Sequence, residues 1–161
     1  DWSIGGRRVV LREGVGPAII RVRGGSIVGV ERRAPSAGVV TVDAGSDIVM
    51  AGLVDSHVHV NEPGRTEWEG FASATRAAAA GGVTTIIDMP LNSIPATTSV
   101  AGLEAKVAAA AGKCAVDLGL WGGAVPGNAR EIPRLAEAGA LGFKCFLTPS
   151  GVAEFENIDE A

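Results

Sequence analysis

The sequence predicts an α/β fold built on a parallel sheet and preceded by a small layer of β-strands. Strand-like and helix-like segments alternate along residues 51–161, which is typical of right-handed βαβ units. Residues 1–50 contain strand-like runs with no helical segment between them, which favours a separate β layer or sandwich. Glycine accounts for 23 of the 161 residues, about twice the usual share, and this indicates many tight connections.

The first fifty residues contain short apolar runs bounded by glycine. Gly24-Gly25 separates two of these runs and predicts a hairpin, because glycine supplies the positive φ angles that a two-residue turn needs. We expect residues 1–50 to form part of a small β domain. The predicted strands are residues 7–11, 18–23, 26–32, 39–42 and 48–50.

From residue 51 onward, apolar strands alternate with helices that are rich in alanine. Each predicted helix is followed by glycine, the residue that most readily adopts the left-handed conformation after a helix. Four strands and three helices fit either an open doubly wound sheet or about half of an eight-stranded barrel. The predicted strands are residues 52–60, 83–88, 115–121 and 141–147, and the predicted helices are residues 68–80, 99–111 and 128–138.

Composition and charge exclude several classes of protein. The formal net charge of −4 argues against a nucleic-acid-binding surface and against a polybasic membrane patch. No apolar segment approaches the ~18 residues of a membrane-spanning helix. The two cysteines, Cys114 and Cys145, lie far apart, which excludes a disulfide-rich secreted scaffold and suits a reducing compartment. We therefore expect a cytoplasmic protein with no nucleic-acid or membrane partner.

The clearest chemical signal is the pair His57 and His59, the only two histidines in the chain. Alternate residues of a strand point to the same side of the sheet. Two imidazoles at the carboxyl end of a strand can therefore share one divalent metal ion such as zinc. Parallel α/β folds place their sites at that edge. An ordinary pair of hydrogen-bonded histidines is the alternative interpretation.

The second signal is Lys144, which lies in the middle of an apolar strand. A buried cation is costly, and a buried lysine has a lowered pKa, so that its amine becomes usable in the neutral form. Position alone favours a different interpretation, in which the lysine reaches solvent from the strand end.

Polar residues follow three of the predicted strands and are candidate contacts for a substrate. Asn61 lies two residues beyond the second histidine, and Asn92 follows the second strand. Ser150 and Gly151 follow the fourth strand, where backbone N–H groups can bind an oxygen anion. Turn and cap residues are the alternative interpretation for each of these positions.

Together these residues resemble the amidohydrolase superfamily, in its cyclic amidase branch. The segment from Gly52 to His59 is similar to the first barrel strand of that family, in which the two histidines bind the more buried metal of a binuclear centre. A lysine on the fourth strand, here Lys144, is carboxylated by CO₂ and bridges the two metals. The resemblance implies the first half of a metal-dependent (β/α)8 TIM barrel (residues 51–161), preceded by part of a composite β-sandwich domain (residues 1–50).

Within this branch the sequence is similar to the allantoinase family, on residues 61–71, 81–93, 142–147 and 150–151. This resemblance implies hydrolysis of the cyclic amide of allantoin to allantoate, in purine catabolism, by a homotetramer. It implies two divalent metal ions, with zinc as the default, held by His57 and His59 and bridged by N6-carboxylated Lys144. The implied substrate-binding residues are Asn61, Asn92, Ser150 and Gly151.

Related families provide the alternatives. Dihydroorotases typically carry arginine where this chain has Asn61, and that guanidinium pairs with a substrate carboxylate, a group that allantoin lacks. Hydantoinases and dihydropyrimidinases usually place a tyrosine shortly after the bridging lysine, and this chain has no tyrosine. A dihydropyrimidinase-like scaffold without activity, or a regulatory or assembly module, is the alternative from another class.

The resemblance also implies residues that the chain does not contain. The family needs two further histidines on later strands and an aspartate as general base, which we expect beyond residue 161. Because the chain begins without methionine and ends without a helix stop signal, we expect it to be a piece of a longer protein. Half a barrel exposes sheet edges, so we expect this piece alone to be unstable and inactive on allantoin.

Overall fold

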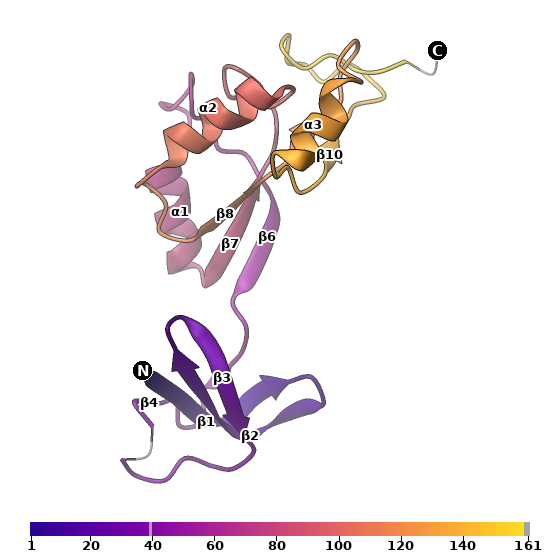
Figure 1. Ribbon diagram of the computed structural model, residues 1–161. Helices are drawn as coiled ribbons and strands as arrows, with labels where there is room; N and C mark the ends of the chain where they lie inside the picture. The colour runs from indigo at the N-terminus through magenta and orange to yellow at the C-terminus, as the bar shows by residue number, and fades with distance from the viewer. Residues whose placement is uncertain (39, 160–161) are drawn as a thin grey trace. The chain divides into compact units, whose positions relative to one another are not determined.

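The computed structural model describes residues 1–38 and 40–159. The chain divides into two compact units, Asp1–Ala51 and Gly52–Ala161. The described part of the first unit contains strands without helices, whereas the second combines strands with helices (Figure 1). None of the helices in residues 1–38 and 40–159 has the length and apolar character needed to cross a membrane.

The first unit is a single five-stranded sheet. Its central strand β1 pairs antiparallel with β2 and parallel with the short strands β4 and β5, while β3 pairs antiparallel with β2. Gly24 and Gly25 have φ angles of 53° and 79° and form the turn between β2 and β3, which confirms the predicted hairpin. The strands are β1 (Trp2–Leu11), β2 (Gly14–Arg23), β3 (Ser26–Glu31), β4 (Val42–Asp43) and β5 (Ile48–Val49).

Strand β1 begins earlier than the sequence predicts, because glycine occurs inside the strand and not only at its boundary. A Cβ atom at Gly5 would lie 3.1 Å from the carbonyl oxygen of Ala18 and 3.2 Å from the Ile19 side chain. Glycine at this position therefore allows a close approach of two strands. Within the predicted strand 39–42, Val42 lies in the two-residue strand β4, and Val39 lies outside the described residues.

The second unit alternates strands and helices, as the sequence predicts, and this confirms the α/β fold class. Strands β6, β7 and β8 form a parallel sheet in that order, and β9 pairs parallel with β10. Only Trp121 separates β8 from β9. The elements are β6 (Leu53–Val58), α1 (Phe71–Ala80), β7 (Val83–Asp88), α2 (Val100–Ala110), β8 (Asp117–Leu120), β9 (Gly122–Gly123), α3 (Glu131–Glu137) and β10 (Phe143–Lys144).

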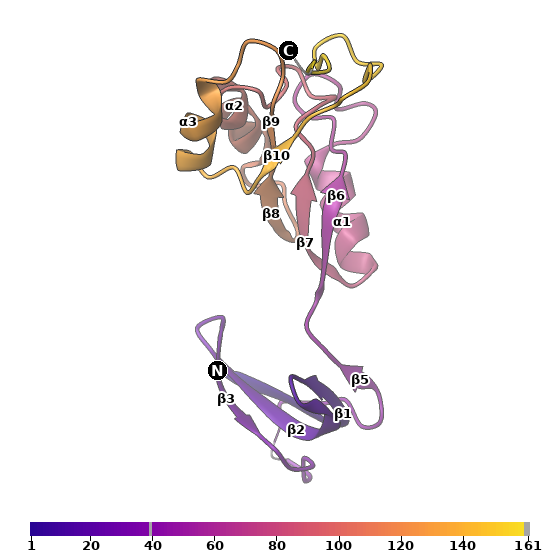
Figure 2. The same cartoon turned by 90° about the vertical axis from the view of Figure 1, so that its right-hand side faces the viewer.

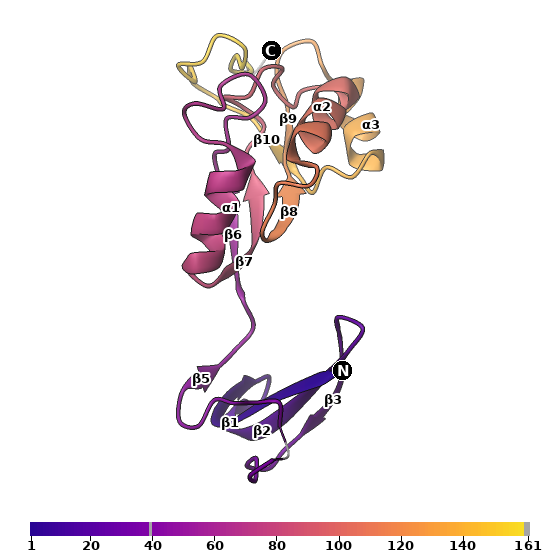
Figure 3. The same cartoon turned by 90° about the vertical axis from the view of Figure 1, so that its left-hand side faces the viewer.

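The three helices of this unit lie on one face of its strands, which Figure 2 and Figure 3 show from opposite sides. The buried side chains of Phe71, Ile86 and Ala110 form a core cluster that joins helices α1 and α2 to the sheet. The carboxyl ends of the strands, and the loops that follow them, gather at one end of the unit (Figure 2). The predicted site residues lie on these loops and strand ends.

Most elements of this unit are shorter than the sequence predicts, among them helix α3, which begins at Glu131 and not at Asn128. Helix α1 begins at Phe71 and not at Trp68, because the carbonyl of Glu69 accepts a hydrogen bond from the amide of Asn61 (2.9 Å) and belongs to the preceding loop. The predicted strand 141–147 contracts to β10. The strand with which β10 pairs, β9, has only two residues. The two strands also approach each other closely, since a Cβ atom at Gly122 would lie 2.6 Å from the Phe143 ring.

Candidate functional site

The two histidines lie side by side where β6 ends. Their ring centroids are 5.4 Å apart and their ring planes are inclined by 47°. Two imidazoles that bind one tetrahedral zinc ion, at about 2.0–2.1 Å each, have their ring centroids roughly 5 Å apart. The spacing of His57 and His59 therefore fits a shared metal ion.

An irregularity in β6 sets the positions of these rings. The register between β6 and β7 shifts between Asp55 and Val58, so that β6 carries one residue more than its partner. The Asp55 carboxylate accepts a hydrogen bond from the backbone N–H of His57 (3.1 Å), and the indole N–H of Trp121 donates to the carbonyl of Ser56 (2.9 Å). A bulge of this kind redirects side chains. Strand alternation alone therefore does not determine where the histidines point.

The surroundings of His59 favour its neutral form. Burial lowers the pKa of His59, and the positive charges of Lys144, His57 and Lys106 lower this pKa further. The neutral imidazole is the form that binds metal ions. The side-chain amide of Asn92 lies 3.3 Å from Nδ1 of His59, and a hydrogen bond at one ring nitrogen orients the other for a ligand.

Lys144 lines the same open pocket as His57. The pocket has a volume of about 370 Å³, and Met89, Trp121, Phe143 and Cys145 complete its lining. Burial lowers the pKa of Lys144, which raises the share of neutral amine at a given pH. The structure thus brings two of the predicted metal-site residues together in one pocket, while the third, His59, contacts the first through its ring.

The histidine pair and Lys144 do not by themselves complete a metal site. Among the described residues, no group of three or more His, Cys, Asp or Glu side chains is arranged to hold a metal ion. The roles of His57, His59 and Lys144 as ligands stay predictions, although their chemistry and spacing fit a divalent ion.

Asn61 follows the histidines and is buried, with 8% of its surface exposed. Its side-chain oxygen Oδ1 has no hydrogen-bond partner among the described residues. A buried amide oxygen without a partner is costly. The side chain therefore retains an acceptor for a further donor, and its predicted contact with substrate stays a prediction.

Arg65, in the loop after β6, contacts the loops that follow β7 and β10. Its Nη1 atom donates to the backbone carbonyl of Asn92 (2.8 Å) and also pairs with the carboxylate of Glu154. Its guanidinium group lies over the ring of Trp68, 4.9 Å from the ring centroid. Asn92 itself has a positive φ of 73°, so its backbone is held in a conformation that few residues other than glycine adopt.

Ser150 and Gly151 do not line the pocket of His57 and Lys144. The hydroxyl of Ser150 donates to the carbonyl of Phe155 (2.5 Å) and accepts a hydrogen bond from the N–H of Val152 (3.1 Å). Both residues line a separate hollow at residues 149–157. The Ser150 side chain is thus committed to its own turn, and the predicted binding of an anion by these backbone amides stays a prediction.

Glu62 is a structural residue that the sequence did not reveal. Its side chain is 8% exposed, and its carboxylate accepts from the N–H of Phe71 at the start of α1 (3.0 Å) and pairs with Lys113. Burial raises the pKa of Glu62, but the hydrogen bonds from Lys113 and Phe71 outweigh burial and lower the pKa overall. Glu62 therefore caps helix α1 from the preceding loop.

A second missed feature is the pair of Asp88, the last residue of β7, and Lys106 of α2. Both side chains are fully buried, with 0% exposed, and their charged atoms lie 2.6 Å apart. Burial raises the pKa of Asp88 to about 6, against the opposing effect of Lys106. The fully buried lysine of this unit is thus Lys106, whereas Lys144 is only half-buried. The presence of Lys106 in an otherwise apolar helix hints at burial, but it does not reveal the partner.

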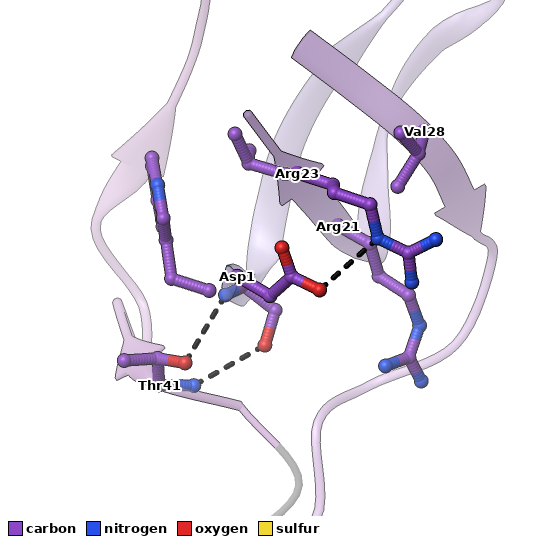
Figure 4. A pocket seen from close by; sticks show the side chains of 8 residues that line it. Asp1, Arg21, Arg23, Val28 and Thr41 are labelled. Atoms are coloured by element: carbon purple, nitrogen blue, oxygen red, sulfur yellow. Dashed lines mark hydrogen bonds and ion pairs between the residues drawn. The ribbon is translucent and has the colours of Figure 1, made fainter. Parts of the chain in front are cut away.

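A separate hollow in the first unit is lined by arginines (Figure 4). Arg23 donates to the carboxylate of Asp1 (3.0 Å), and Arg21 donates to the carboxylate of Glu31 (2.5 Å). Since both guanidinium groups already have carboxylate partners, we assign no function to this hollow.

Comparisons with known proteins agree with this arrangement. The model of the "Amidohydrolase family" matches residues 48–155. An allantoinase of Streptomyces avermitilis is 53% identical over 156 residues, which are 95% of this chain and 35% of that protein. A probable allantoinase 2 of Dictyostelium discoideum is 65% identical over 114 residues, 70% of this chain and 22% of that protein. The chain thus spans about a third or less of the length of these relatives.

The solved structures that match include hydantoinases. The L-hydantoinase (dihydropyrimidinase) of Arthrobacter aurescens superposes with a TM-score of 0.84 and 30% identity, over 99% of this chain and 36% of that chain. A D-hydantoinase superposes with a TM-score of 0.77 and 28% identity, over 99% of this chain and 35% of that chain. These matches confirm the fold class predicted from the sequence, with the second unit as the first part of an amidohydrolase barrel.

Proposed function

The chain belongs to the amidohydrolase family, and on that premise we propose that the full-length protein, at the length of its relatives, is an allantoinase. It hydrolyses the cyclic amide of allantoin to allantoate. One observation carries the choice of substrate: relatives that are named allantoinases are 44–65% identical to this chain, whereas the L-hydantoinase and D-hydantoinase structures described above are 30% and 28% identical. The fold alone fits both kinds of enzyme.

In this proposal His57 and His59 bind a divalent metal ion, for which zinc is the default. When bound, such an ion polarises a carbonyl group and lowers the pKa of water. The support is the 5.4 Å separation of the two rings and the burial that lowers the pKa of His59. The second metal ion of the predicted pair needs ligands from outside this chain.

As a carbamate, Lys144 would help to hold both metal ions. The neutral amine adds to CO₂ and releases one proton, so that the side chain gains a negative charge that offsets the metal charges. Support comes from the lowered pKa of Lys144 and from its place beside His57. The general base of the reaction, an aspartate, is expected beyond residue 161.

Asn61 and Asn92 contact the substrate in this proposal. Allantoin is a neutral ring with several amide groups, so a neutral amide side chain suits it better than a guanidinium does. The unpartnered Oδ1 of Asn61 supports such a contact. For Ser150 and Gly151 we propose contacts through the backbone N–H groups only, since the Ser150 hydroxyl already serves its turn. We further propose a homotetramer in the cytoplasm.

The test is turnover by the full-length protein, loaded with zinc in the presence of bicarbonate. Allantoin, dihydroorotate, hydantoin and dihydrouracil are compared as substrates. We expect turnover of allantoin alone. Turnover of a different ring instead would contradict the choice of substrate and leave the family intact. Absence of both turnover and bound metal would favour a non-catalytic scaffold.

Removal of metal ligands tests the site itself. We expect His57→Asn and His59→Asn to lower kcat/KM at least about 10³-fold, since a bound metal supplies several kcal/mol of transition-state stabilisation. Metal content, measured by elemental analysis, should fall in the same variants. Arg32→Gln, on the surface of the first unit, is the matched control and should change neither quantity. Unchanged metal content in both histidine variants would refute the assigned ligands.

A further inference from the structure

Asp88 and Lys106 form a buried ion pair directly behind the candidate site. Both side chains are 0% exposed, and Nζ of Lys106 lies 2.6 Å from Oδ2 of Asp88. Removing two charges from water costs several kcal/mol for each ion, and well-packed apolar residues often replace such pairs without loss of stability. Stability alone therefore gives a weak reason for an ion pair at this position.

The remaining hydrogen bonds of the pair all go to backbone groups beside the site. Oδ1 of Asp88 accepts from the N–H of Val60 (2.6 Å), and Nζ of Lys106 donates to the carbonyl of Met89 (2.9 Å). Val60 stands between His59 and Asn61. Met89 lines the pocket of His57 and Lys144. The pair thus holds both neighbouring strands at the level of the site.

The need for this contact follows from the way β6 ends. The ladder between β6 and β7 is already irregular between Asp55 and Val58. The carbonyl of Val58 still accepts a hydrogen bond from the N–H of Met89 on the neighbouring strand (2.8 Å). Two residues further along the chain, the N–H of Val60 donates to the Asp88 side chain. A carboxylate therefore continues the hydrogen bonding where the regular ladder stops.

We propose that Asp88 and Lys106 are positioning residues, which fix the backbone at Val60 and thereby hold the His59 ring and the Asn61 amide in place for metal and substrate. Asp88 provides the acceptor, and Lys106 neutralises and orients that carboxylate from helix α2. The inference rests on the proposed function in one respect, namely that His59 binds a metal ion.

Two double variants separate positioning from stability. In D88L/K106M the pair is replaced by apolar side chains, so the buried charges and the acceptor for Val60 are both lost. In D88N/K106M the charges are lost but the asparagine oxygen still accepts from the Val60 amide. The exposed pair Arg32 and Glu13, changed to glutamine at both positions, is the matched control.

The measurements are made on the full-length protein loaded with cobalt(II). Urea unfolding gives stability, the visible absorption spectrum reports the geometry of the metal ligands, and titration gives the affinity for cobalt(II). We expect D88L/K106M to bind cobalt(II) about 10- to 100-fold more weakly, as for the loss of residues that orient metal ligands, with an altered spectrum. D88N/K106M and the control should keep the spectrum and most of the affinity.

Each outcome decides the matter. A wild-type spectrum and affinity in D88L/K106M would overturn the positioning role and leave the proposed function standing. If the unmodified protein binds no cobalt(II), the proposed function fails and the inference fails with it. If D88L/K106M does not fold, D88A/K106M takes its place, and we expect the same weaker cobalt(II) binding and altered spectrum. Unfolding of both, with D88N/K106M folded, would show that the pair serves stability and would overturn the inference.

Discussion

The two units of the chain use charged side chains in different ways. In the first unit Arg32 and Glu13 pair on the surface with 60% and 63% of their side chains exposed, whereas Lys106 and Asp88 of the second unit are 0% exposed. Exposed pairs contribute about 0–1 kcal/mol, but the effect of a buried pair depends on all of its hydrogen bonds. The buried pair of Asp88 and Lys106 therefore organises the backbone at the ends of β6 and β7.

The largest expected effect comes from breaking the buried pair on one side only. Lys106→Met leaves the carboxylate of Asp88 buried without its counter-charge, so we expect a loss of about 3–5 kcal/mol in the free energy of unfolding. Urea unfolding of the full-length protein measures this loss. A loss below about 1 kcal/mol would remove the distinction between the buried and the exposed pairs.

The next effect concerns the loops at the strand ends. Arg65→Gln removes the ion pair with Glu154 and the contact over the Trp68 ring, and we expect a loss of about 1–2 kcal/mol. Amide hydrogen exchange should accelerate at residues 92–94, whose loop Arg65 holds. Faster exchange spread evenly over the unit would instead indicate general destabilisation.

A smaller effect, with a defined pH dependence, is expected at Glu62. Because hydrogen bonds lower the pKa of Glu62 in the folded protein below its ordinary value of 4.5, the unfolded chain binds more protons at low pH. The stabilisation is therefore complete above about pH 4.5 and is lost as the pH falls through the folded-state pKa.

Glu62→Gln tests this cap. We expect a loss of about 1 kcal/mol at pH 7, typical of a lost helix cap, and a weaker decline of stability between pH 4.5 and pH 3 than in the unmodified protein. Urea unfolding at several pH values measures both. Glu67→Gln, at another position in the same loop, is the matched control. An unchanged acid profile in Glu62→Gln would refute the capping role.

The smallest effect is expected in the first unit. Changing Arg32 and Glu13 together to glutamine should alter the free energy of unfolding by no more than about 0.5 kcal/mol. Raising the salt concentration should reduce even this difference, since exposed charges are screened. A larger loss would show that surface pairs stabilise the first unit as well.

Hydrophobic patterning and glycine placement predicted most of the fold. The Gly24-Gly25 turn and the alternation of strands with helices α1, α2 and α3 follow from local preferences, which act within a few residues. Element boundaries were less predictable. The start of α1 depends on Glu62, which lies nine residues before Phe71, and the length of β10 depends on the short partner strand β9.

The candidate site likewise combines features that the sequence predicts with features that it does not. The motif of His57 and His59 and the position of Lys144 were visible in the sequence, because strand alternation and an unusual residue type are local signals. Glu62 and Arg65, which the sequence alone allows as solvated loop charges, are structural partners of Lys113 and Glu154. The importance of Lys106 was not visible, because its partner Asp88 lies 18 residues away.

The sequence by itself determined the order of the elements, the family resemblance and the residue types available for metal binding. The tertiary structure decided which charges are buried, where β6 departs from its ladder, and which backbone groups Asp88 and Arg65 hold. The physical reason is that secondary structure follows from short-range preferences. Burial and the pairing of charges depend on which distant segments share a core, and single-residue patterns carry little information about that.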